Sequence, residues 1–241
     1  KSISDRYEIH NVAENVFDIC FDEYMQRHKP DYLINLAWVT GVGYLESFEN
    51  VRFVQKGLEM YEAFYKYGGK RAVFVGTEQE YERKNEPLKE TDSIAPISLY
   101  AECKADLGKI LVKNSLLEGK GFVWARLFFI YGTGEKNKRL MPSIINALLR
   151  DEDVTCSHEG YVRDYIHVED VAAAILCCLF SDYTGYVNVG GGRETTIGEI
   201  AQVIKEYIGG SGKVHFRTYE ECNQPMFIQA DNSLLKSLGW S

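Results

Sequence analysis

The feature that most constrains this 241-residue chain is a unit that recurs three times in its first half, a helical segment followed by a short apolar strand. The helical segments are 17–28, 47–67 and 97–117, and the strands that follow them are 32–37, 71–75 and 122–130. Such strands alternate little, as is typical of strands buried on both faces. Helix–strand repeats build a parallel sheet covered by helices, so we predict a doubly wound α/β fold.

The second half departs from this rhythm. After a charged loop we expect helices over 142–150 and 168–180, and extended segments near Val154, at 164–167 and at 186–189. A capping box formed by Thr196 and Glu199 predicts the start of a further helix, which ends at Ile208. We therefore expect a dinucleotide-binding domain over 1–132, completed by 164–190, and a small substrate lobe made of 133–163 and 191–241.

Composition excludes several function classes. The net charge is −8 and no run of Lys or Arg is present, which argues against nucleic acid as a partner. No stretch of about 18 apolar residues occurs, and residues 1–6 lack the apolar core of a signal peptide, so we expect neither membrane insertion nor export. The six cysteines form no Cys-x-x-Cys pair and have no His at metal-ligand spacing, which predicts reduced thiols, no metal site and a cytoplasmic location.

Candidate catalytic and ligand-binding residues are expected at one edge of the sheet. Tyr100 and Lys104, four residues apart, share one helix face, and a nearby cation favours the phenolate that a general base requires. Thr77 follows the strand 71–75 and small Ala37 ends the strand before it, where ligands of such sheets bind. The alternative is a solvated helix face on which Lys104 snorkels to water.

The ordered set of motifs resembles the extended short-chain dehydrogenases/reductases, in the nucleotide-sugar epimerase/dehydratase group. The matching segments are PDYLINLA at 30–37, VGT at 75–77, Tyr100-x-x-x-Lys104, ARLFFIYG at 125–132, RDYIHVEDV at 163–171 and VNVG at 187–190. The resemblance covers nearly the whole chain. It implies a Rossmann-like fold, NAD or NADP as cofactor and a nucleotide-diphosphate sugar as substrate.

The resemblance also implies roles for single residues. Tyr100 corresponds to the catalytic acid/base at a sugar hydroxyl or carbonyl, and Lys104 to the residue that lowers its pKa and binds the nicotinamide ribose. Thr77 would hydrogen-bond the reacting oxygen, Ala37 would line the dinucleotide, and the backbone of Phe128 would approach the nicotinamide carboxamide.

Three further residues are implied to bind substrate. Asn50 opens a helix beside the site, or else only caps that helix. Arg163 matches an arginine that contacts the diphosphate, the alternative being a structural pair with Asp164 or Glu169. Arg139 stands where many epimerases have an asparagine at the phosphates, although in so charged a loop it could point to water.

A homodimer is likewise implied, because the family pairs the helices at 47–67 and 97–117 between subunits. The residues available for an apolar pairing face are Phe53, Met60, Phe64, Ile110 and Leu111, unless they pack on the sheet instead.

Differences from the family's motifs reduce the number of activities that we expect for this chain. Dehydratases of this group follow their Thr with Asp-Glu, whereas this chain has Glu78-Gln79, and an amide cannot take a proton. The family's Gly-x-x-Gly-x-x-Gly turn is not found, and the first βαβ unit, about 50 residues, is expected to be missing from the front. We therefore expect an NAD(P)-dependent epimerase or 4-keto-reductase, the alternatives being a 4,6-dehydratase or a non-catalytic sugar-nucleotide or dinucleotide-binding protein.

Overall fold

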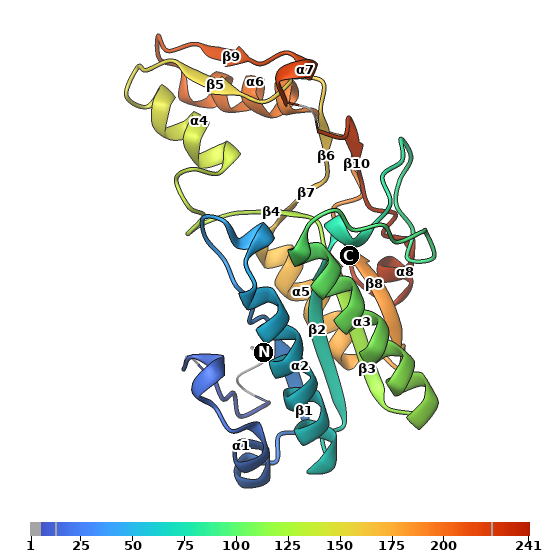
Figure 1. Cartoon of the computed structure of the whole chain (residues 1–241). Helices are drawn as coiled ribbons and strands as arrows, with labels where there is room; N and C mark the ends of the chain where they lie inside the picture. Colours follow the sequence, from blue (N-terminus) through green and yellow to red (C-terminus); the bar gives the residue numbers. More distant parts are fainter. Residues whose placement is uncertain (1–5, 13, 223) are drawn as a thin grey trace.

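The computed structural model describes residues 6–12, 14–222 and 224–241. Residues 1–5, which include most of the segment searched for a signal peptide, lie outside the described residues. In Figure 1 the chain forms a lower body built on a sheet and an upper lobe of helices and short strands.

The sheet of the lower body has four parallel strands. They are β1 (Tyr32–Asn35), β2 (Arg71–Thr77), β3 (Gly121–Leu127) and β8 (Gly185–Val189), hydrogen-bonded in that spatial order. The helices that connect them are α2 (Glu49–Lys66), α3 (Leu99–Glu118) and α5 (Val168–Phe180). The parallel α/β architecture predicted from the helix–strand repeats is therefore confirmed.

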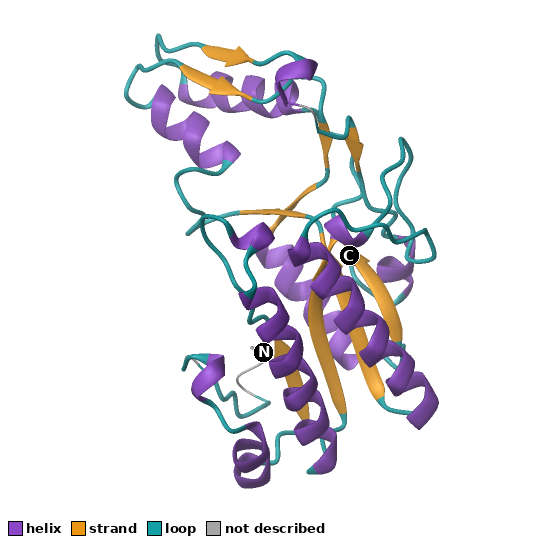
Figure 2. Cartoon of the chain, viewed as in Figure 1, coloured by secondary structure: helices purple, strands orange, loops and turns teal. Residues whose placement is uncertain are grey.

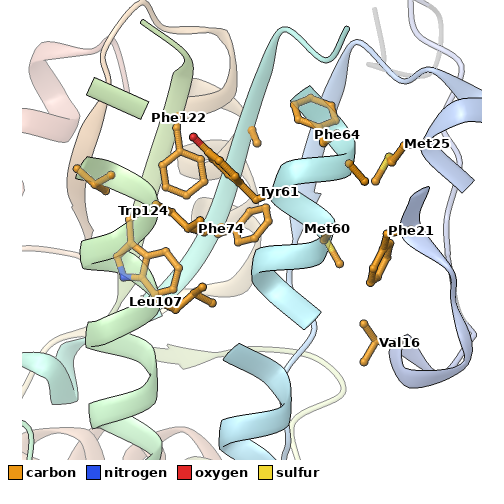
Figure 3. Packing of buried hydrophobic residues seen from close by; sticks show 14 residues of the cluster. Val16, Phe21, Met25, Met60, Tyr61, Phe64, Phe74, Leu107, Phe122 and Trp124 are labelled. Atoms are coloured by element: carbon orange, nitrogen blue, oxygen red, sulfur yellow. The ribbon is translucent and has the colours of Figure 1, made fainter. Parts of the chain in front are cut away.

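Alternation of side chains along β2 and β3 divides the core into two layers. Phe74, Phe122 and Trp124 point to one face and pack against α2 and α3, as Figure 3 shows. Val73 and Val123 point to the opposite face and pack with α5. Each fully buried large side chain contributes about 1.5–3 kcal/mol, so both faces of the sheet stabilise the body.

The remaining elements complete the body and form the lobe, which Figure 2 shows as helices beside short strands. The further elements of the body are η2 (Val16–Asp18), α1 (Phe21–His28), η3 (Tyr44–Glu46), η4 (Glu78–Glu80) and α8 (Ser233–Ser237). The elements of the lobe are α4 (Leu140–Leu148), β5 (Val154–Cys156), α6 (Ile197–Ile208), β9 (Val214–Phe216) and α7 (Tyr219–Cys222). Two parallel strand pairs run between them, β4 (Phe129–Tyr131) with β7 (Tyr165–His167), and β6 (Val162–Arg163) with β10 (Phe227–Ile228). The predicted capping box is confirmed, since Thr196 and Glu199 satisfy each other's backbone donors.

One predicted strand is wrong in its extent. The run 122–130 is not continuous, because the chain changes partner at Phe128. The N–H of Phe128 still donates to the carbonyl of Val189 in β8, whereas the N–H of Phe129 donates to that of Asp164. The apolar pattern continues across this point, so the sequence alone does not reveal where the backbone leaves the sheet for the lobe.

Two negative findings apply to the residues that the structure describes. None of their helices combines the length and apolar character needed to cross a bilayer. Nor do three or more His, Cys, Asp or Glu side chains of residues 6–12, 14–222 and 224–241 gather as a group able to hold a metal ion.

Candidate active site

The turn after β2 is closed by a reciprocal cap. The Thr77 hydroxyl oxygen accepts from the N–H of Gln79 at 3.3 Å, and the Glu80 carboxylate accepts from the N–H of Thr77 at 2.9 Å. Since the cap uses Thr77 as an acceptor, its O–H remains a donor for another group.

A buried ion pair fixes this turn. Glu80 accepts from Arg126 Nε at 2.7 Å and from Trp124 Nε1 at 3.0 Å, and neither Glu80 nor Arg126 has more than 3% of its side chain exposed. The guanidinium lies between the rings of Tyr81 and Tyr186, 4.5 and 4.2 Å from their centroids. Burial opposes the charge of Arg126, but Glu80 and Tyr81 outweigh it and raise its pKa.

Sequence reasoning missed this pair, although a signal was present. Arg126 lies within an otherwise apolar strand buried on both faces. A cation there must meet an acid, because an isolated buried charge is too costly to keep. Glu80, in the turn after the neighbouring strand, is that acid.

Tyr100 lies in the first turn of α3 and is half-buried. Burial raises the pKa of its phenol, and the nearby Thr77 hydroxyl, which hydrogen-bonds to it, acts in the opposite direction. The charges of Tyr44, Glu80 and Glu78 add to the rise. The phenol is therefore protonated at neutral pH and is a proton donor within reach of Thr77.

Lys104, one turn further along α3, is turned inward. It is 3% exposed, so it does not snorkel to water. Its Nζ donates to the carbonyl of Val75 at 2.6 Å and lies 3.9 Å from the ring centroid of Trp38. Burial lowers its pKa to about 7, against the opposing attraction of Glu80. Thr77, Tyr100 and Lys104 are thus brought together at the carboxyl end of β2.

Two expected cofactor residues lie at the carboxyl ends of neighbouring strands. Ala37 is exposed just beyond β1, where its N–H donates to the side chain of Asn35 at 3.0 Å. Phe128 is 5% exposed and its ring lies in a core cluster with Tyr81 and Leu88. Only the backbone of Phe128 can therefore face a ligand.

Asn50 is fully buried, and its side chain is used within the protein. Its amide nitrogen donates to the carbonyls of Tyr44 and Ser47, and its oxygen accepts from Trp38 Nε1 at 2.8 Å. In this structure Asn50 ties the loop before α2 to the indole of Trp38, a partner that the sequence did not identify.

The two arginines expected at the substrate differ in setting. Arg163 is buried and donates to the carbonyl of Val162 at 2.8 Å and to Gln224 at 3.3 Å. It forms no ion pair with Asp164, whose carboxylate accepts backbone N–H groups instead. Arg139, which precedes α4, is largely exposed and pairs with Glu135 at 3.3 Å.

Glu78 adds a carboxyl group beside Thr77. It is buried, and burial raises its pKa, while Arg83 at 2.6 Å and Arg163 favour the charged form. The Glu78-Gln79 pair noted in the sequence therefore offers one ionisable group here, not two.

A hollow lies away from these groups, between α1 and α2. Its volume is about 630 Å³, and it is lined by side chains that include Phe17, Lys56, Glu59 and Lys66. None of the groups gathered around Thr77 lines it, so we assign the site by its chemistry.

Comparison with known proteins agrees with the expected resemblance. The model of the NAD dependent epimerase/dehydratase family matches residues 8–190. GDP-L-fucose synthase 1 of Arabidopsis thaliana is 25% identical over 242 residues, covering 91% of this chain and 74% of that protein.

Two solved structures share the fold, each with a TM-score of 0.83 and 25% identity over 95% of this chain. They are a UDP-N-acetylglucosamine 4-epimerase of Methanobrevibacter ruminantium, of which 76% is covered, and a UDP-glucose 4-epimerase of Thermotoga maritima, of which 78% is covered.

The buried ion pair yields a stability prediction. Replacing Glu80→Gln leaves Arg126 charged without its counter-ion, so the free energy of unfolding should fall by about 3–5 kcal/mol in urea titrations. Arg150→Met, which removes a pair whose side chains are 62% and 57% exposed, serves as the control and should change little. Equal stability of the Glu80 variant and the wild type would contradict the assigned role.

Lys104 yields a prediction about pH. Its folded pKa of about 7 lies below the ordinary value of 10.5. Between these values the unfolded chain binds more protons, so the wild type gains stability as pH rises, and Lys104→Met does not. The stability advantage of Lys104→Met should thus be about 2–3 kcal/mol larger at pH 6 than at pH 9. A pH-independent difference would show that the ammonium is not desolvated.

Proposed function

The chain belongs to the NAD-dependent epimerase/dehydratase family, and from this membership we propose that it is an NAD(P)-dependent nucleotide-sugar epimerase or 4-keto-reductase. The observation that carries the proposal is the convergence of Thr77, Tyr100 and Lys104 at the carboxyl end of β2. Relatives named as a GDP-L-fucose synthase and as UDP-sugar 4-epimerases support a nucleotide sugar as the substrate class.

The proposed proton chemistry follows from the burial of the site. In the reductive direction Tyr100 begins protonated and gives its proton to a sugar carbonyl oxygen as that oxygen gains negative charge. Thr77 donates a second hydrogen bond to the same oxygen. In the oxidative direction Tyr100 begins as a phenolate, which the cation of Lys104 stabilises, and it accepts the proton of the sugar hydroxyl.

The residues at the strand ends fit the nicotinamide side of a dinucleotide. Small Ala37 leaves backbone accessible, and Lys104 retains N–H donors besides the one given to Val75. Phe128 would contribute its backbone. Bound NAD or NADP supplies the hydride acceptor or donor.

The substrate lobe would hold the nucleotide. We propose that residues 1–132 with 164–190 form the dinucleotide-binding domain, and that 133–163 with 191–241 form the lobe, except that α8 packs against β8 in the body. Arg163 and Arg139 would bind the diphosphate, Arg163 as a guanidinium already fixed by its carbonyl partners and Arg139 after release from Glu135. Asn50 would act by holding the loop beside the site.

Two alternatives predict different outcomes. A dehydratase requires a base where this chain has Gln79, and would release a 4-keto-6-deoxy sugar. A binding protein without catalysis would bind nucleotide sugars or NAD(P)(H) without turnover. An epimerase returns the hydride to the sugar and works with catalytic NAD, whereas a reductase consumes NAD(P)H, so nicotinamide absorbance separates the two.

We further propose a cytoplasmic homodimer. All six cysteines are free thiols, which supports a reducing compartment. Of the residues expected at a pairing face, Met60, Phe64 and Leu111 pack in the core, while Ile110 is 48% exposed and Leu117 on the same face of α3 is 72% exposed. These two side chains support pairing through α3.

The catalytic assignment predicts the effect of removing one hydroxyl. Tyr100→Phe should lower turnover of an accepted nucleotide sugar by about 10²–10⁴-fold with binding of NAD(P)(H) retained, because only the transferable proton is lost. Tyr44→Phe removes the hydroxyl of a ring that packs 5.1 Å from Tyr100 and should act near the wild-type rate. Undiminished turnover in Tyr100→Phe would refute the assignment.

The dimer proposal predicts a change of mass. Sedimentation equilibrium should give a dimer for the wild type and a monomer for Ile110→Glu/Leu117→Glu, because two charges would be buried in the interface. Val203→Glu, at a 53% exposed position in the lobe, is the control and should remain dimeric. A monomeric wild type would contradict the proposal.

A further inference from the structure

Trp38 lies directly after Ala37, just beyond the carboxyl end of β1. We propose that Trp38 is a positioning residue, whose indole face keeps the Lys104 ammonium charged and directed into the reaction site. The inference rests on the proposed function of Lys104 and adds a determinant that belongs to this chain.

The first observation is the geometry of the ammonium. Lys104 Nζ lies 3.9 Å from the ring centroid of Trp38, and the ring of Trp124 is more distant at 5.8 Å. The carbonyl of Val75 accepts one of its three N–H donors. A cation over an indole face in a desolvated pocket is attracted by the ring quadrupole, so Trp38 favours the charged form of Lys104.

The second observation is that the indole is held independently of Lys104. Trp38 Nε1 donates to Asn50 at 2.8 Å, and Phe53 stacks on the ring at 5.4 Å with an interplanar angle of 27°. Asn50 is itself fixed by two backbone carbonyls of the preceding loop. The orientation of the indole ring is therefore fixed by contacts that do not involve Lys104.

The third observation concerns the charges around Lys104. Glu80 from η4 is the charged group that acts on Lys104, whereas Glu80, Glu78 from η4 and Tyr44 from η3 act on the neighbouring phenol of Tyr100. Glu80 is paired with Arg126, and Glu78 with Arg83.

An aromatic face has a consequence that a carboxylate partner would not have. It stabilises the ammonium without cancelling its charge, so the positive charge stays available to a group bound in the site. This explains why a bulky indole beside the ammonium serves the site better than another acid would.

The test is a pH titration of the indole ¹⁵N–¹H signals of the intact protein, which contains Trp38, Trp124 and Trp240. Each signal is assigned from its Trp→Phe variant. The Trp38 signal should move sigmoidally with a midpoint near 7, where Lys104 titrates. Lys104→Arg, charged throughout, should abolish the movement, and Trp240, bonded to the carbonyl of Asp170, is the internal control.

Kinetics supplies the second readout. Trp38→Leu should shift the alkaline limb of kcat/KM down by about one pH unit, because the charged lysine loses its aromatic partner, and Trp38→Phe should shift it less.

The outcomes separate this inference from the proposed function. A Trp38 signal that stays still, or that moves equally in Lys104→Arg, overturns the inference. Tyr100-dependent turnover with an unshifted profile in Trp38→Leu also overturns it. If the signal titrates as expected but no nucleotide sugar is converted, the inference stands and the proposed function fails.

Discussion

The buried ion pair between Glu80 and Arg126 is the interaction on which the site depends. It joins the turn after β2 to the carboxyl end of β3, and Tyr81, which accepts from Arg126, donates in turn to Asn188 in β8. One carboxylate thus fixes the backbone of Thr77, the indole of Trp124 and the guanidinium of Arg126. Because a charge left alone there would cost several kcal/mol, the turn has little freedom to move Thr77 away from Tyr100.

The same burial sets the protonation of the reactive groups. It disfavours charge on both Tyr100 and Lys104, so the phenol keeps its proton while the ammonium is close to losing its own at neutral pH. Both groups are therefore sensitive to any charge that enters the pocket, whether from substrate or from a nicotinamide ring. Burial of these ionisable groups lowers the folding stability, and this cost is common at functional sites.

Much of the fold, and part of the site, follows from local sequence patterns. Helix–strand repeats predicted the parallel sheet, and spacing placed Tyr100 and Lys104 on one helix face near Thr77. The sequence did not reveal contacts between distant residues, such as Arg126 with Glu80, which are 46 positions apart, or Trp38 with Asn50. The turn from β3 into the lobe at Phe128 was missed for the same reason, since the chain remains apolar while its partner strand changes.

A double-mutant cycle in turnover tests most directly whether the ion pair acts through the reacting tyrosine. The four proteins are the wild type, Glu80→Gln, Tyr100→Phe and the double variant, assayed with one nucleotide sugar where all are folded. If the pair positions Thr77 against Tyr100, Glu80→Gln should lower kcat markedly in the wild type and add almost nothing once Tyr100 is phenylalanine. Effects that simply multiply would contradict this account and show that the ion pair stabilises the fold without shaping the reaction.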